Sequence, residues 1–193
     1  MAALRLVDRS LIDLDSDVNH WLRTWKVPDS RFTLEQPVTL RLLLSHNAGI
    51  NVCCFPGYES GANTPSTKGI LEGVGNTDPI QVDTLPGSIF RYSGGGYTIV
   101  QMLIEDITGK PFPEALKELV LNSLGMYQST FSQGQPHDRK QEAAHAHQTS
   151  DEPIKGNWHL YPEQAAAGLW TTPKDLARYM IGVSQAYLGE DSS

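Results

Sequence analysis

Tyr92 is the residue of this sequence whose type and position best suit it to catalysis. It precedes Ser93 and a run of glycines, and an apolar helical pattern begins directly after them. Free backbone N–H groups at the start of a helix favour negative charge, so a phenolate would be stabilised there. Tyr92 is therefore a candidate general base. The alternative interpretation is that the glycines only form a tight turn and that Tyr92 packs.

Other serine and glycine patterns give weaker candidates. The glycine run lacks the Gly-x-Gly-x-x-Gly spacing and the preceding strand of a dinucleotide site. Ser60 stands one place too late for the Gly-x-Ser-x-Gly turn that presents a nucleophile. Ser45 and His46 are adjacent, and neighbouring residues on one helical turn rarely face each other, so a structural role is favoured for this pair.

A metal site is one interpretation of a histidine-rich stretch late in the chain. Its candidate ligands are His137, Glu142, His145 and His147. No group that would orient these ligands is evident, and the surrounding residues are polar. We therefore interpret 132–157 as an exposed loop or lid, and we expect neither a metal nor an organic cofactor.

Aromatic and sulfur-containing residues add two further candidates. Trp158, His159 and Tyr161 are candidates for a substrate-facing surface, although aromatic residues at loop ends more often pack. Cys53 and Cys54 are adjacent, so they form neither a disulfide framework nor a Cys-x-x-Cys metal site. Buried apolar packing is the expected role of both cysteines.

Length and charge limit the class of protein. The chain has 193 residues, 39% of them hydrophobic, which suits one domain over 1–193. The net charge is −7 and the basic residues are scattered, so nucleic acid is not an expected partner. No apolar stretch is long enough to span a membrane. The first eight residues lack the basic and apolar segments of a signal peptide.

Apolar periodicity predicts that helices position these residues. The expected helices cover 2–14, 39–44, 97–107 and 113–121. A further helix should begin at Pro173, because Thr172 is a good cap and proline suits the first helical position. We expect that helix to bury an apolar side made of Leu176, Tyr179, Met180 and Val183.

Several segments resemble those of the serine β-lactamase and penicillin-binding-protein family, in its class C, D-aminopeptidase and esterase-like branch. The stretch 42–50, Leu-Leu-Leu-Ser-His-Asn-Ala-Gly-Ile, is similar to that family's Leu-Leu-Ser-His-Thr-Ala-Gly-Leu segment. The other similar segments are 57–58, 86–97, 108–112, 124–126 and 166–173. They follow one another in the order found in the family and extend over nearly the whole chain.

The resemblance implies roles for two residues. Tyr92 matches the tyrosine of the family's Tyr-x-Asn motif, which relays a proton between the catalytic serine and the leaving group. Gly94 stands where the asparagine of that motif contacts substrate. Loss of this amide makes strong β-lactam hydrolysis doubtful, but it leaves esterase and peptidase activity open.

Two motifs of the family are missing from the 193 residues. No serine is followed three residues later by lysine, so there is no Ser-x-x-Lys nucleophile. Neither Lys-Thr-Gly nor His-x-Gly occurs. The resemblance implies that the serine would lie before Met1, that the other motif would lie beyond position 193, and that both missing parts would build the sheet.

The expected fold is therefore a mainly α segment of the α+β serine β-lactamase/transpeptidase-like fold, with most of the central antiparallel sheet absent from this chain. The implied parent protein is a serine hydrolase that forms an acyl-enzyme on an amide or ester. Its partner would be a small-molecule or peptide substrate. The alternative is a degenerate or truncated family member that binds without catalysis.

Overall fold

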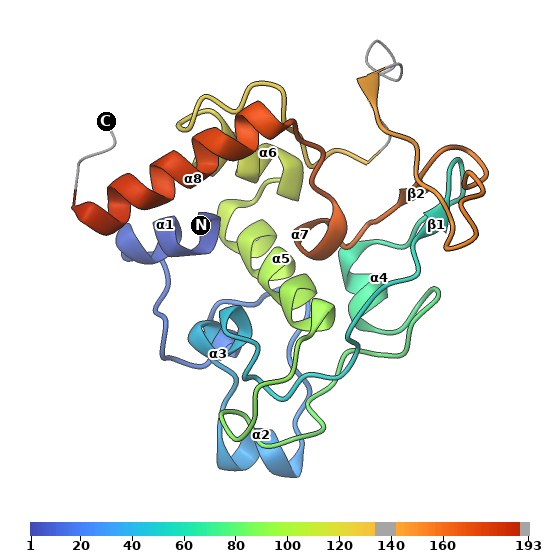
Figure 1. Cartoon of the computed structure of the whole chain (residues 1–193). Helices are drawn as coiled ribbons and strands as arrows, with labels where there is room; N and C mark the ends of the chain where they lie inside the picture. Colours follow the sequence, from blue (N-terminus) through green and yellow to red (C-terminus); the bar gives the residue numbers. More distant parts are fainter. Residues whose placement is uncertain (134–141, 190–193) are drawn as a thin grey trace.

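The computed structural model describes residues 1–133 and 142–189. Helix α5 (Gly94–Thr108) lies in the middle of the molecule, and the other elements surround it (Figure 1). The elements in contact with α5 are α1 (Ala2–Asp8), α3 (Leu40–Leu44), α4 (Thr67–Leu71), α6 (Phe112–Leu116) and α7 (Gln164–Ala167). The described residues form a helical assembly around one buried helix.

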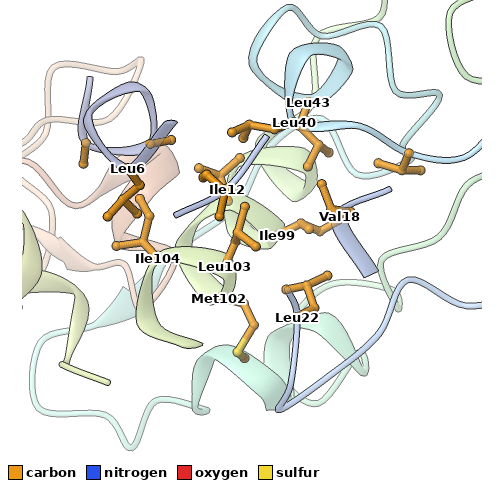
Figure 2. Close-up of a cluster of buried hydrophobic side chains, with 14 of the residues drawn as sticks. Leu6, Ile12, Val18, Leu22, Leu40, Leu43, Ile99, Met102, Leu103 and Ile104 are labelled. Carbon is orange, nitrogen blue, oxygen red and sulfur yellow. The ribbon is translucent and has the colours of Figure 1, made fainter. Parts of the chain in front are cut away.

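Apolar side chains bury most of α5. Ile99 and Leu103 are completely buried and belong to one cluster with Leu6, Ile12 and Val18 (Figure 2). The helix is longer than the expected 97–107, because residues 94–96 belong to its first turn. It ends at Gly109, which has the left-handed φ of 65° that lets a helix stop.

The other expected helices are present, with different ends. α3 begins after Thr39, whose side chain caps it, and α6 continues into a π-helical turn, η2 (Lys117–Leu121), as expected for 113–121. Two short elements, the 3-10 turn η1 (Val18–His20) and α2 (Arg31–Glu35), complete the first half of the chain.

The first helix is shorter than the expected 2–14. It stops at Asp8 because Ser10 adopts a left-handed φ of 57°, and Leu11 N–H then turns back to Leu6 C=O at 3.0 Å. Its buried side consists of Ala2, Ala3 and Leu6, whereas Leu4 and Leu11 are exposed.

Within the described residues, strand structure is limited to two strands of two residues each. β1 (Tyr58–Glu59) pairs antiparallel with β2 (His159–Leu160), with Tyr58 opposite Leu160. No larger sheet occurs within the residues that the structure describes. A mainly helical segment without a central sheet is what the sequence predicted.

Helix α8 (Pro173–Leu188) begins where expected, and the Thr172 hydroxyl accepts the Asp175 N–H at 3.2 Å. Its inner side was predicted wrongly for three of four residues: Leu176, Met180 and Val183 are exposed, and Tyr179 alone is partly buried. The buried residues of α8 are Asp175 and Gly182. Helical spacing identifies an apolar face, but it does not say whether another element covers that face.

Asp175 fixes the start of α8 to the segment before it. Its carboxylate accepts hydrogen bonds from Gln128 N–H at 2.8 Å, from Ser129 Oγ at 2.9 Å and from the Arg178 guanidinium at 2.8 Å. Burial raises the pKa of Asp175, but these hydrogen bonds outweigh burial and leave the pKa below its ordinary value.

One polar side chain on α5 holds three distant segments together. The Gln101 amide donates to Thr67 Oγ1 at 3.0 Å and to Pro162 C=O at 3.1 Å, and it accepts the Ala165 N–H at 3.0 Å. Thr130 and Trp170 also join distant parts of the chain, through two reciprocal backbone hydrogen bonds.

Among the described helices, none has the length and apolar character that a membrane span requires.

Candidate functional site

The start of α5 is built from one side-chain cap and two backbone contacts. Ser93 is the N-cap: its Oγ accepts the Gly96 N–H at 3.1 Å and donates to Asn51 C=O at 2.7 Å. Gly94 N–H donates to Cys53 C=O at 2.8 Å, and Gly95 N–H donates to Val52 C=O at 3.1 Å. The first amides of the helix are therefore all in use.

This arrangement corrects the electrostatic argument made for Tyr92. We expected its hydroxyl to lie near free N–H groups, but the chain segment at 51–53 supplies partners for them. A phenolate at Tyr92 would thus gain only from the helix dipole and not from direct amide donation. The sequence could not reveal this, because the carbonyls come from about forty residues upstream of the helix.

Tyr92 itself lies one residue before the cap and is 55% exposed. Its ring rests against the His46 imidazole, with centroids 4.5 Å apart and planes tilted by 37°. His46 also contacts Tyr97 at 5.1 Å and the ring of Phe90 edge-on at 6.0 Å. Tyr92 is accessible from solvent and is held on one face by an aromatic cluster.

Gly94, the second predicted site residue, is buried inside the helix start. A Cβ at this position would lie 2.9 Å from Phe55 Cε2 and 3.0 Å from Cys53 O. Both distances are too short for an unstrained side chain, so the asparagine of the Tyr-x-Asn pattern has no room here. The glycine is required by the path of residues 53–55.

Tyr97, one turn into α5, was not singled out from the sequence. It lines an apolar cavity of about 270 Å³ together with residues 1–3, α6 and the start of α8. Its hydroxyl donates to Leu44 C=O at 3.2 Å, and burial, with the neighbouring phenols of Tyr92 and Tyr179, raises the pKa of Tyr97. Tyr97 and Tyr179, but not Tyr92, line this cavity with Ala2 and Ala3.

Arg91 holds the chain segment that leads to Tyr92. Its guanidinium donates to Gly49 C=O at 2.9 Å and forms an ion pair with Asp83. Burial raises the pKa of Asp83, but the hydrogen bonds from Arg91 and Thr84 outweigh burial, so the pKa lies below its ordinary value. Asp83 thus remains a fixed negative partner for Arg91 at neutral pH.

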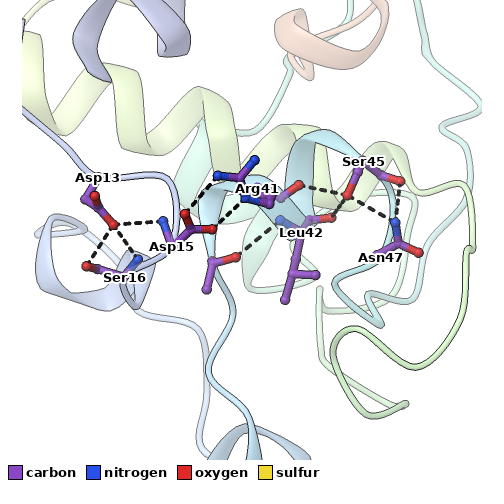
Figure 3. A network of polar contacts seen from close by, with 8 residues as sticks. Asp13, Asp15, Ser16, Arg41, Leu42, Ser45 and Asn47 are labelled. Atoms are coloured by element: carbon purple, nitrogen blue, oxygen red, sulfur yellow. Dashed lines mark hydrogen bonds and ion pairs between the residues drawn. The ribbon is translucent and has the colours of Figure 1, made fainter. Parts of the chain in front are cut away.

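The serines near the site have structural partners. Ser45 Oγ donates to Arg41 C=O at 2.8 Å and is contacted by the Asn47 amide at 3.1 Å, next to the Arg41–Asp15 ion pair (Figure 3). It makes no hydrogen bond to His46. Ser93 is 3% exposed, and its hydroxyl donates to Asn51 C=O and accepts the Gly96 N–H as the cap of α5. Neither serine is presented as a nucleophile.

The aromatic residues late in the chain line a second cavity, of about 230 Å³. Trp158 meets Trp170 edge-to-face at 5.3 Å, and His159 and Tyr161 complete one wall. Trp158 is buried, so it packs, while Tyr161 is partly accessible. The expectation that these residues face a substrate stays a prediction.

The structure also places the candidate metal ligands and the two cysteines considered in the sequence. Among residues 1–133 and 142–189, no group of His, Cys, Asp or Glu is arranged to hold a metal ion, and His137 lies outside the described residues. Cys53 and Cys54 are exposed and joined by a disulfide, which contradicts the expected burial. Their contribution to the site is the Cys53 carbonyl.

Comparison with known proteins gives consistent relationships. The family model described as Beta-lactamase matches residues 1–192. Esterase EstB of Burkholderia gladioli is 28% identical over 166 residues, which are 80% of this chain and 40% of the esterase. Penicillin-binding protein 4 of Amycolatopsis lactamdurans is 27% identical over 126 residues, which are 65% of this chain and 31% of that protein.

The solved structures show the same fold. A D-stereospecific amidohydrolase from Streptomyces sp. superposes with a TM-score of 0.71 at 22% identity, over 95% of this chain and 57% of that chain. The chain thus spans about a third to a little over half the length of these relatives. Its fold is the mainly helical part of the β-lactamase/transpeptidase architecture, as the sequence predicted.

Proposed function

Because this chain belongs to the β-lactamase family, we propose that it forms the tyrosine-bearing helical part of a serine hydrolase. The reaction would proceed through an acyl-enzyme formed on an amide or ester. The observation that carries this proposal is the position of Tyr92, exposed and directly before the capped start of α5. The relatives bear the names of an esterase, a penicillin-binding protein and an amidohydrolase, which supports this class of reaction.

Tyr92 would transfer protons in this reaction. A serine from outside the 193 residues would attack the acyl carbonyl, its proton would pass to the tyrosine relay, and the relay would protonate the departing amine or alcohol. Water would then attack the acyl-enzyme with the proton moving in the opposite direction. Gly94 would supply no amide to this relay, because Phe55 and the Cys53 carbonyl fill the space that an asparagine side chain would need.

A second candidate function has its own support. The 193 residues hold no Ser-x-x-Lys, and Gly94 has no room for the asparagine of the family pattern. A family member without these groups would bind a small molecule or peptide without cleaving it. The substrate class of the catalytic alternative, whether a β-lactam, a D-amino-acid peptide or a simple ester, stays open.

The decisive observation is the reading frame on both sides of this segment, followed by kinetics. A Ser-x-x-Lys shortly before Met1 supports the hydrolase, and its absence supports the binding protein. With the motif present, Tyr92→Phe should lower the rate by about 10²–10⁴ because one proton-transfer group is lost. A rate within about threefold of the parent protein would reduce Tyr92 to a packing residue.

The chain of 193 residues should be inert by itself, because its sequence has no Ser-x-x-Lys motif and neither Ser45 nor Ser93 is presented as a nucleophile. Chromogenic cephalosporin, a short nitrophenyl ester and a fluorescent penicillin test this directly. Turnover or covalent labelling above that of the denatured chain would contradict the proposal. Mass spectrometry of the labelled peptide would then identify the nucleophile.

A further inference from the structure

His46 makes a hydrogen bond to the residue on each side of Tyr92. Its backbone C=O accepts the Arg91 N–H at 2.8 Å, and its ring Nδ1 accepts the Ser93 N–H at 3.2 Å. The Tyr92 ring lies against the same imidazole, with centroids 4.5 Å apart. One residue therefore fixes the backbone before and after Tyr92 and supports its ring.

The position of His46 is itself strongly constrained. It follows α3 with a left-handed φ of 59°, a conformation that costs a non-glycine residue on the order of 1 kcal/mol. Asn47 N–H turns back to Leu42 C=O at 2.8 Å and closes the end of the helix. His46 thus occupies the left-handed position that ends α3, and its hydrogen bonds to Arg91 and Ser93 join this helix end to the residues around Tyr92.

The imidazole is also fixed by its environment. Tyr97 lies on it at 5.1 Å, and Phe90 meets it edge-on at 6.0 Å. The titratable and charged groups around it are the phenols of Tyr92 and Tyr97 and, through the adjoining residue, the Arg91–Asp83 ion pair. Because the His46 ring is held in this way and contacts the Tyr92 ring, it restricts the orientation of the Tyr92 side chain.

We propose that His46 is the positioning residue of Tyr92, acting as a neutral imidazole whose Nδ1 accepts the Ser93 N–H. This inference rests on the proposed function of Tyr92. The acceptor role requires the proton to sit on Nε2, because a protonated Nδ1 would face the Ser93 N–H donor to donor. Protonation of the ring must therefore release Ser93 and loosen Tyr92.

Nuclear magnetic resonance of the 193-residue chain tests this without any catalytic assay. Long-range ¹H–¹⁵N correlation should show the His46 ring protonated on Nε2 and free on Nδ1. On acid titration, the Ser93 amide should shift with the same midpoint as the His46 ring. An Nδ1–H tautomer, or a Ser93 amide that does not follow the ring, would overturn the proposal.

Two variants separate positioning from packing. His46→Asn keeps an acceptor oxygen where Nδ1 lies, tolerates the left-handed backbone and does not titrate, so Ser93 should stay protected and lose its acid dependence. His46→Ala removes the acceptor, so hydrogen exchange at Ser93 should accelerate about tenfold or more and the Tyr92 ring carbon signals should move. The exposed His20→Ala is the control and should change neither signal.

If His46→Ala fails to fold, the native titration and the asparagine variant still decide the question. Equal protection of the Ser93 amide from hydrogen exchange in the parent chain and in a folded His46→Ala variant would refute the proposed positioning role of His46. In a catalytically competent longer form, His46→Ala should lower kcat about 10- to 100-fold with little change in KM, and asparagine should restore part of it. If the Ser93 amide follows the His46 ring but Tyr92→Phe does not change the rate, the catalytic role of Tyr92 is refuted and the positioning role of His46 stands.

Discussion

The carbonyl oxygen of Cys53 accepts the Gly94 N–H at 2.8 Å and also lies 3.0 Å from the position that a Cβ on Gly94 would occupy. One backbone atom thus completes the start of α5 and forbids a side chain there. The neighbouring ring of Phe55 closes the remaining side, at 2.9 Å from the same position.

Gly94→Ala should destabilise the chain by about 1–3 kcal/mol, because the new methyl group overlaps a backbone oxygen that cannot rotate away. Gly96→Ala is the matched control. Its Cβ would meet Leu43 Cδ2 at an ordinary 3.5 Å, so the change should be neutral or stabilising by up to about 1 kcal/mol. Urea unfolding followed by circular dichroism measures both, and equal costs would contradict the steric argument.

Glu163→Gln should change the pH dependence of stability. Glu163 is completely buried, and neither carboxyl oxygen accepts a hydrogen bond from another described residue, so burial raises its pKa. A raised folded pKa stabilises the protein below the unfolded pKa, and this contribution is lost as pH rises through the folded pKa. The variant should match the parent near pH 4 and be more stable by about 1–3 kcal/mol near pH 8.

The measurement is the difference in unfolding free energy between Glu163→Gln and the parent chain across that pH range. Taking the difference cancels the titration of distant groups such as Asp175 and Asp83. The exposed Glu35→Gln should give a small difference that does not depend on pH in this way. A flat difference for Glu163→Gln would show that its carboxyl group is ionised and compensated in the native state.

Met180→Lys combined with Tyr187→Lys should reduce self-association of the chain. These side chains are 66% and 90% exposed and continue an apolar stripe along α8 with Leu176 and Val183. Contiguous exposed apolar surface promotes association, whereas single surface changes alter folding free energy by about 0.5 kcal/mol or less. Sedimentation velocity should show less oligomer at an unchanged unfolding midpoint.

The control for this experiment adds the same charge without removing apolar surface. Ala177→Lys with Ser184→Lys changes two exposed positions of the same helix. It should lower self-association less than the first pair does. If both pairs act equally, net charge and not the apolar stripe governs association.

Helices with strong local signals could be predicted from the sequence. The apolar spacing of α5, the Thr172 cap of α8 and the Thr39 cap of α3 all lead to elements at the expected places. α2 was missed although its signal is present, since Ser30 and Thr33 form a reciprocal capping box. The early end of α1 has no glycine to mark it, because Ser10 takes the left-handed position.

What depends on distant contacts could not be predicted. Motif resemblance singled out Tyr92, yet the residue that contacts its ring and both neighbours, His46, lies about forty-five residues away and was judged only as a partner of Ser45. The free N–H groups expected at α5 are occupied for the same reason. Exposure of the α8 stripe depends on what packs against it, which no local pattern contains.

Two sets of hydrogen bonds close the base of the long chain segment between Thr130 and Trp170. One is the pair of backbone bonds between these two residues, and the other joins Gln101 to Pro162 and Ala165. Lengthening a loop that is closed at its base costs little, about 0.6 kcal/mol for each doubling of its length. Insertions into the exposed stretch 147–153 between these two closures should therefore cost little in the packing of α5. That stretch therefore tolerates added recognition segments while the packing around α5 is kept.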